Sequence, residues 1–177
     1  MRKRLIAAFM ACLALTLGMI VTLTSAAQAA DPSQCATDRQ TAIDRQLTKA
    51  PGGKALDERT ISYLEGKVLV TLVSPQSCGE TTTMAKSDCP LGWLCFWEDP
   101  SFQGTRWQFQ DEGYWQDLRQ WGVDIFYSFY NHRADAFLLR RTSSSNVLCY
   151  NAEGSGSNVG TTVGGYRYIF LRQTAGC

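Results

Sequence analysis

The chain has 177 residues, with 17 Lys and Arg against 16 Asp and Glu. This near balance of charge, without a Lys/Arg stripe beyond the first residues, argues against nucleic acid and anionic membranes as partners. A single histidine, His132, is the one available for a Ser-His-Asp or Cys-His arrangement, and histidine is too scarce for a zinc site. We therefore expect a protein that is not an enzyme, although paired carboxylates at 98–99 and 111–112 keep a glycosidase as a minor alternative.

The first segment has the pattern of an export signal. Basic residues at 2–4 precede an apolar stretch at 5–23, and Ala27, Gln28 and Ala29 offer a small-x-small cleavage site. We expect residues 1–29 to be removed and the mature protein to be secreted into the extracellular space. A membrane anchor is the alternative, because the apolar stretch is nearly long enough to span a bilayer; the cleavage site favours export.

Removal of the signal leaves six of the seven cysteines and a net charge of about −2. An even number of cysteines in an exported chain favours disulfides over thiolate chemistry or a metal cluster. The six are Cys35, Cys78, Cys89, Cys95, Cys149 and Cys177.

Residues 30–80 are predicted to form a helix followed by a β-hairpin. Asp31 and Pro32 suit a helix start, Ile43 and Leu47 fall on one helical face, and Pro-Gly-Gly at 51–53 ends the helix. Apolar segments at 61–63 and 68–73, with a turn at 64–67, predict the hairpin. The unit is too small to bury much core alone, and a Cys35–Cys78 bridge would stabilise it by about 2–4 kcal/mol.

Residues 81–88 are polar and aperiodic, which indicates a linker, and the chain from Cys89 onward is predicted to be all β. Thr105, Trp107 and Phe109 alternate with polar residues, as in a strand with one buried face. Further strands are expected at 126–130, 136–140, 146–150 and 166–171.

The stretch from Cys89 to Gly104 is the most informative part of the chain. Cys89 and Cys95 bracket Pro and Gly and can close a small loop. Aromatic residues at 97 and 102, followed by Gly104, have the spacing of the folded hairpin in a βγ-crystallin Greek key, where glycine takes a conformation costly for other residues. The segment resembles the start of the secreted bacterial metalloproteinase inhibitors of peptidase inhibitor family thirty-six, which open with Cys-Pro-x-Gly-x-Leu-Cys.

This resemblance implies a mainly β, βγ-crystallin-like double Greek-key sandwich over residues 89–177. Residues 94–96 reappear as the similar tripeptide at 148–150, which suggests a second, degraded motif that lacks the later aromatic residue. With Cys89–Cys95 closed locally, Cys149–Cys177 is the remaining bridge, but six cysteines allow fifteen connectivities and sequence alone does not choose between them. The N-terminal unit is similar to an appendage of exported actinobacterial members of the family.

The resemblance also implies an inhibitory site. In the family a reactive bond follows a cysteine in a short Cys-x4-Cys loop, which carries over to Cys149–Tyr150, with Tyr150 presented to a thermolysin-like metalloproteinase. The position of the second loop cysteine holds Gly154 here, in a segment at 154–157 whose composition indicates flexibility. Zinc would belong to the target peptidase, and the inhibitor itself is expected to be a monomer without a cofactor.

A non-enzymatic module that binds a cell-wall glycan or another surface ligand is the alternative function. Trp115 and Trp121, which flank a polar turn, are the aromatic residues expected to be partly exposed for such binding. A calcium pattern of βγ-crystallins survives only in Asp124 and Ser128, so weak or absent calcium binding is expected.

Overall fold

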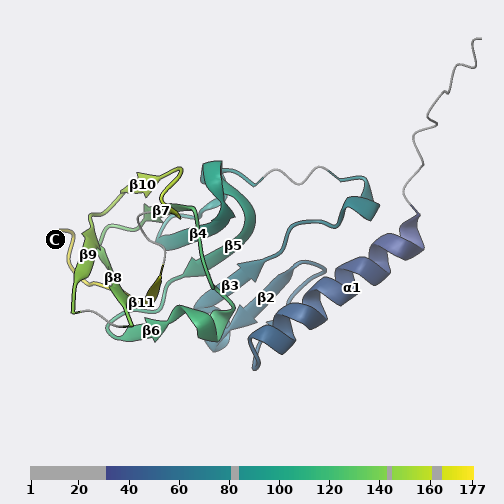
Figure 1. The fold of residues 1–177 in the computed structure, drawn as a ribbon, viewed down its shortest axis with the longest axis horizontal. Coiled ribbons are helices and arrows are strands. Elements are labelled where there is room, and N and C mark those ends of the chain that lie inside the picture. Colours follow the sequence, from purple (N-terminus) through teal and green to yellow (C-terminus); the bar gives the residue numbers. More distant parts are fainter. Residues whose placement is uncertain (1–30, 81–83, 143–144, 161–164) are drawn as a thin grey trace, which may run out of the picture.

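Two antiparallel sheets and one long helix make up the computed structural model, which describes residues 31–80, 84–142, 145–160 and 165–177 (Figure 1). The first sheet has the strand order β1-β2-β3-β5-β4-β7-β10, and the second has the order β6-β11-β8-β9. The elements are α1 (Pro32–Lys49), β1 (Lys54–Ala55), β2 (Thr60–Tyr63), β3 (Val68–Thr71), β4 (Trp93–Asp99), β5 (Gln103–Phe109), β6 (Trp115–Asp117), β7 (Ser128–His132), β8 (Phe137–Arg141), β9 (Val147–Tyr150), β10 (Ser155–Gly156) and β11 (Tyr166–Leu171).

The strands from β4 onward form two Greek-key motifs that exchange their third strands. Motif one contains β4 to β7, but β6 pairs with β11 in the sheet of motif two. Motif two contains β8 to β11, and β10 pairs with β7 in the sheet of motif one. The predicted double Greek-key sandwich is thereby confirmed. The similar tripeptides at 94–96 and 148–150 are not at equivalent positions in the two motifs. Residues 94–96 lie on the first strand of motif one, whereas residues 148–150 lie on the second strand of motif two.

The hairpin between β4 and β5 has the folded shape that the aromatic and glycine spacing predicts. Gly104 has a φ of 81°, and a Cβ placed there would lie 2.7 Å from Oδ2 of Asp99. The hydroxyl of Ser128 accepts a hydrogen bond from the Phe102 N–H (2.9 Å) and donates one to the Asp99 carbonyl (2.8 Å). Ser128 is fully buried, so β7 fixes the hairpin from inside the domain.

The N-terminal unit extends the first sheet. The predicted helix and hairpin both form, and β3 pairs with β5 in antiparallel register, with Val70 opposite Trp107. Ile43 of α1 and Ala50, the C-cap of this helix, are buried in the same core as Phe109. The helix and hairpin of residues 31–80 therefore share a sheet and a core with the described part of residues 89–177, and they do not form an appendage with a core of its own.

The predicted linker at 81–88 is only partly described, and its described part packs on the domain. Met84 is 4% exposed and contacts a cluster with Cys89, Cys95 and Trp97. The Asp88 carbonyl accepts a hydrogen bond from Arg106 (2.7 Å), and the short helix Lys86–Asp88 precedes the Cys89–Cys95 loop. Residues 84–88 are thus part of the folded domain, which contradicts the expectation of a linker there.

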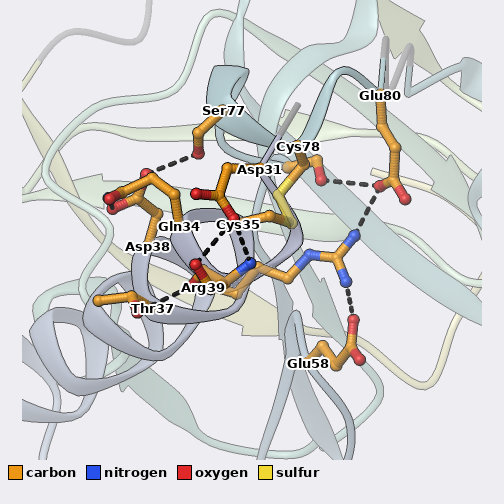
Figure 2. Close-up of a disulfide and its surroundings, with 12 residues drawn as sticks. Asp31, Gln34, Cys35, Thr37, Asp38, Arg39, Glu58, Ser77, Cys78 and Glu80 are labelled. Carbon is orange, nitrogen blue, oxygen red and sulfur yellow. Dashed lines mark hydrogen bonds and ion pairs between the residues drawn. A yellow bond between two sulfur atoms is a disulfide. The ribbon is translucent and has the colours of Figure 1, made fainter. Parts of the chain in front are cut away.

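A disulfide and a set of ion pairs fix the start of α1 (Figure 2). Cys35 is bonded to Cys78, and the guanidinium of Arg39 reaches Glu58 on one side and Glu80 (2.8 Å) on the other. The bonds Cys89–Cys95 and Cys149–Cys177 are also formed, so all three pairings match the expectation. The predicted signal at 1–29 lies outside the described residues. Within the described part of the chain, no helix has the length and apolar character needed to cross a membrane.

Candidate functional site

The proposed reactive bond, Cys149–Tyr150, lies on β9, which is the edge strand of the second sheet. On one side β9 pairs with β8, where Phe137 lies opposite Tyr150 and Leu138 lies opposite Cys149. At an edge, backbone N–H and C=O groups of alternate residues point away from the sheet and can pair with another extended chain. The bond is therefore held in an extended strand, and not in the short loop expected from the family. Its second edge has no partner strand in the described part of the chain.

The side chains of β9 alternate between the core and the surface. Leu148 and Tyr150 pack against the hydrophobic core, while Val147 is 42% exposed. The ring of Tyr150 stacks on Phe137, with centroids 5.0 Å apart, and meets Phe129 edge-on at 4.7 Å. Burial raises the pKa of the Tyr150 hydroxyl. The expectation that Tyr150 is presented to a peptidase pocket is contradicted by this packing, because its side chain points into the sandwich.

The C-terminal segment braces the same strand. Cys149 is bonded to Cys177, whose N–H donates to Oδ1 of Asn151 (3.1 Å). The N–H of Ala136, just before β8, donates to the Thr174 carbonyl (2.8 Å). These contacts hold both strands of the β8–β9 hairpin at the end where the proposed reactive bond lies.

The segment after β9 is also ordered. The carbonyl of Gly154 accepts a hydrogen bond from the Asn131 N–H (2.8 Å), and residues 155 and 156 form β10 beside β7. A Cβ on Gly156 would lie 2.4 Å from a methyl group of Val159. The flexibility expected from the Gly-Ser composition is wrong for residues 154–157, because this segment pairs with β7, and Val159 and Phe129 leave no room for a side chain at Gly156.

The two tryptophans expected at a ligand-binding surface have different environments. Trp121 is 8% exposed, and its ring packs against Tyr63 (centroids 5.4 Å apart), so the expectation of exposure is wrong for this residue. Trp115 is half-buried on β6, as expected, but the guanidinium of Arg140 lies 4.4 Å over its ring and Phe170 packs beside it. Trp121 is therefore too buried to stack on a sugar, and Arg140 already stacks on the Trp115 ring.

The two residues retained from the calcium pattern have partners within the protein. Asp124 forms an ion pair with Lys49 (2.9 Å), and the Ser128 hydroxyl fixes the β4–β5 hairpin. Among the described residues, no group of three or more His, Cys, Asp and Glu side chains is arranged to hold a metal ion. His132 has its Nδ1 2.8 Å from the Cys89 carbonyl and stacks on Tyr130, which is a structural environment.

Sequence reasoning missed the outer face of the second sheet. Strand register places side chains from all four strands there in two rows that cross the sheet. The first row is Trp115, Phe170, Leu138 and Cys149, and the second is Asp117, Tyr168, Arg140 and Val147. The alternation of side chains along residues 166–171 indicates that this strand has two different faces. The residues that share the outer face can be identified only once the register between strands distant in sequence is known.

Comparison with known proteins gives one family match. Residues 82–161 match the model of peptidase inhibitor family I36. No curated protein matches the chain. A solved structure described as "Evolution of the eye lens beta-gamma-crystallin domain fold" aligns at 16% sequence identity with 53% of this chain and 93% of that chain, with a TM-score of 0.38. The fold assignment above is based on the strand topology and not on this alignment.

Proposed function

We propose that this chain, whose residues 82–161 match peptidase inhibitor family I36, inhibits a secreted metalloproteinase of the thermolysin-like type through its edge strand β9. Its role is that of a peptidase inhibitor, not an enzyme. The target class and the contact strand are the proposed parts. Three disulfides fit an oxidising, extracellular compartment, where such a target would be met.

One observation carries the proposal: Cys149–Tyr150 lies on an edge strand that pairs only with β8 among the residues that the structure describes. A peptide that adds a strand to a partner contributes affinity through main-chain hydrogen bonds and selectivity through alternate side chains. Two residues before Cys149, on the same outward face of β9, lies Val147, which is exposed and apolar. We propose that the peptidase pairs with β9 from this open side and contacts Val147.

Rigidity supports inhibition over cleavage. Pairing with β8, the stacking of Tyr150 on Phe137 and the Cys149–Cys177 bond restrain the residues on both sides of the proposed bond. A segment that is ordered before binding loses little conformational entropy on binding. These restraints would replace the small ring that a cysteine at position 154 closes in the family.

Zinc in the proposed complex would belong to the peptidase. The sulfur atoms of Cys149 and Cys177 are joined in a disulfide, and a cysteine ligates a metal as a free thiolate. The inhibitor would therefore occupy the substrate cleft without ligating the metal through cysteine. We expect a one-to-one complex with a monomeric inhibitor.

A titration of the mature, oxidised protein into a thermolysin-type metalloproteinase tests the proposal, with a small peptide substrate reporting residual activity. We expect stoichiometric loss of activity for the wild type. Val147→Lys should weaken inhibition about tenfold or more, because a charged side chain on an edge strand opposes strand addition. Leu56→Lys is the control, since Leu56 is 57% exposed and lies beside β1, at the far edge of the other sheet.

Two results would contradict the proposal. Full activity of the peptidase at excess inhibitor would reject the target class. Equal potency of the Val147→Lys and wild-type proteins would reject β9 as the contact strand. The two tryptophans expected to bind a glycan do not favour that alternative, because Trp121 is buried and Arg140 stacks on the Trp115 ring.

A further inference from the structure

The outer face of the second sheet has the composition of a contact surface for a protein. Tyr168, Phe170 and Leu138 stand half-exposed at its centre, with Trp115 and Arg140 beside them. Trp, Tyr and Arg are the residue types that dominate binding energy in protein interfaces. The opposite faces of these strands carry fully buried residues such as Leu139 and Ile169, so the rows described above point away from the core.

Arg140 lies at the middle of this face, held by rings on two neighbouring strands. Its guanidinium carbon is 4.4 Å from the Trp115 ring and 5.0 Å from the Tyr168 ring. Stacking on aromatic faces orients a guanidinium and leaves its N–H edge free for a carboxylate. The group is thus ordered before any partner binds.

The charges on the face leave Arg140 without an anion. Asp117, the one carboxylate in the two rows, accepts hydrogen bonds from Arg167, including one from Nε at 2.8 Å. No ion pair joins Arg140 to a carboxylate among the residues that the structure describes. An apolar surface with an oriented, unneutralised cation is complementary to an apolar partner surface that carries a carboxylate.

The face is continuous with the proposed inhibitory strand. Arg140 lies opposite Val147, and Leu138 lies opposite Cys149, so both rows end on β9. A peptidase that pairs with the open edge of β9 would bring the surface around its cleft over this sheet. We propose that the outer face of β6, β11, β8 and β9 is a second contact surface for the target peptidase, and that Arg140 binds a carboxylate on the rim of its cleft. This inference rests on the proposed function.

Inhibition constants of three variants against a thermolysin-type metalloproteinase test the inference. Arg140→Gln should raise the constant about tenfold or more, and Arg140→Lys should recover part of the loss because it keeps the charge. Arg45→Gln is the matched control, since it removes the same charge from an exposed position on α1. The wild-type inhibitor should also weaken more than Arg140→Gln when NaCl is raised from about 0.05 M to about 0.5 M, because salt screens a charge pair.

A pair of substitutions at one site guards against effects on folding. Leu138→Glu and Leu138→Lys place opposite charges at the same half-exposed position, and thermal melts establish that both variants fold. We expect the Glu variant to inhibit more weakly than the Lys variant. Potency of Arg140→Gln equal to that of Arg45→Gln, or equal potency of the two Leu138 variants, would overturn this inference and leave the proposed function standing. A wild type that neither binds nor inhibits the peptidase would overturn both.

Discussion

Gln46 on α1 donates its side-chain amide to the backbone carbonyl of Trp121, 3.0 Å away. The same carbonyl accepts a hydrogen bond from the indole N–H of Trp107 on β5 (3.1 Å). Helix α1, the first sheet and the turn after β6 therefore meet at one hydrogen-bond acceptor, the Trp121 carbonyl. Gly122 is the next residue in the chain, and a Cβ there would lie 2.8 Å from the Gln46 amide nitrogen.

Replacement of Gln46 by Ala should lower the free energy of unfolding by about 1–3 kcal/mol, because a buried hydrogen bond and its packing are lost. Urea unfolding of the oxidised protein measures the change. Gln40→Ala is the control: this glutamine is exposed and donates a hydrogen bond to the exposed Asp44 of the same helix (2.8 Å), so its removal should cost less than about 0.5 kcal/mol. Equal effects of the two substitutions would mean that α1 is not anchored through Trp121.

The sequence was informative where the signal is local. Helix capping by Asp31 and the alternation of Thr105, Trp107 and Phe109 predict elements that the structure contains. The environment of Trp121 could not be predicted in this way, because its burial depends on α1 docking against a turn far along the chain. Pairing of β3 with β5 was missed for the same reason, since it joins two segments that each look complete alone.

The candidate site shows the same division. The Cys149–Cys177 bond was anticipated, but the orientation of Tyr150 was not. A strand segment such as 147–150 has no marker for which side chains face the core until its register with β8 is known. The similarity between residues 94–96 and 148–150 suggests that both segments hold the same place in their motifs, and the strand order excludes this.

The ring of Tyr150 should contribute to the stability of the fold, and to inhibition only through that stability. Tyr150→Ala removes a ring packed between Phe137 and Phe129, and we expect a loss of about 2–4 kcal/mol in the free energy of unfolding. Tyr150→Phe keeps the ring and should retain most of the stability and the potency. Thermal melts and inhibition titrations of the two variants measure this. A Tyr150→Ala protein as stable as the wild type would contradict the packing of this ring against the core.

The Cys149–Cys177 bond should protect the inhibitor from cleavage by the peptidase that it inhibits. The double variant Cys149→Ser/Cys177→Ser loses the covalent brace on β9, and we expect a stability loss of about 2–4 kcal/mol together with cleavage near position 149 by the target peptidase. The Cys35→Ser/Cys78→Ser variant is the control, because this bond lies at the start of α1. Mass spectrometry after incubation with the peptidase should find cleavage near 149 only in the first variant. Resistance of both variants would mean that the disulfide does not protect the strand.

Acid should weaken the pairing of β6 with β11. The hydrogen bond from Arg167 is the main cause that lowers the pKa of Asp117 below its ordinary value, while partial burial opposes it. Since the folded-state pKa is below the unfolded one, the stabilisation is present above pH ~4 and is lost as the pH falls through the folded-state pKa. Asp117→Asn keeps a side-chain oxygen for the Arg119 N–H but removes the charge. The stability difference between the wild type and this variant should therefore be largest near neutral pH and shrink below pH ~4, as measured by urea unfolding across that range. A difference that is independent of pH would show that the carboxylate charge of Asp117 does not contribute to the fold.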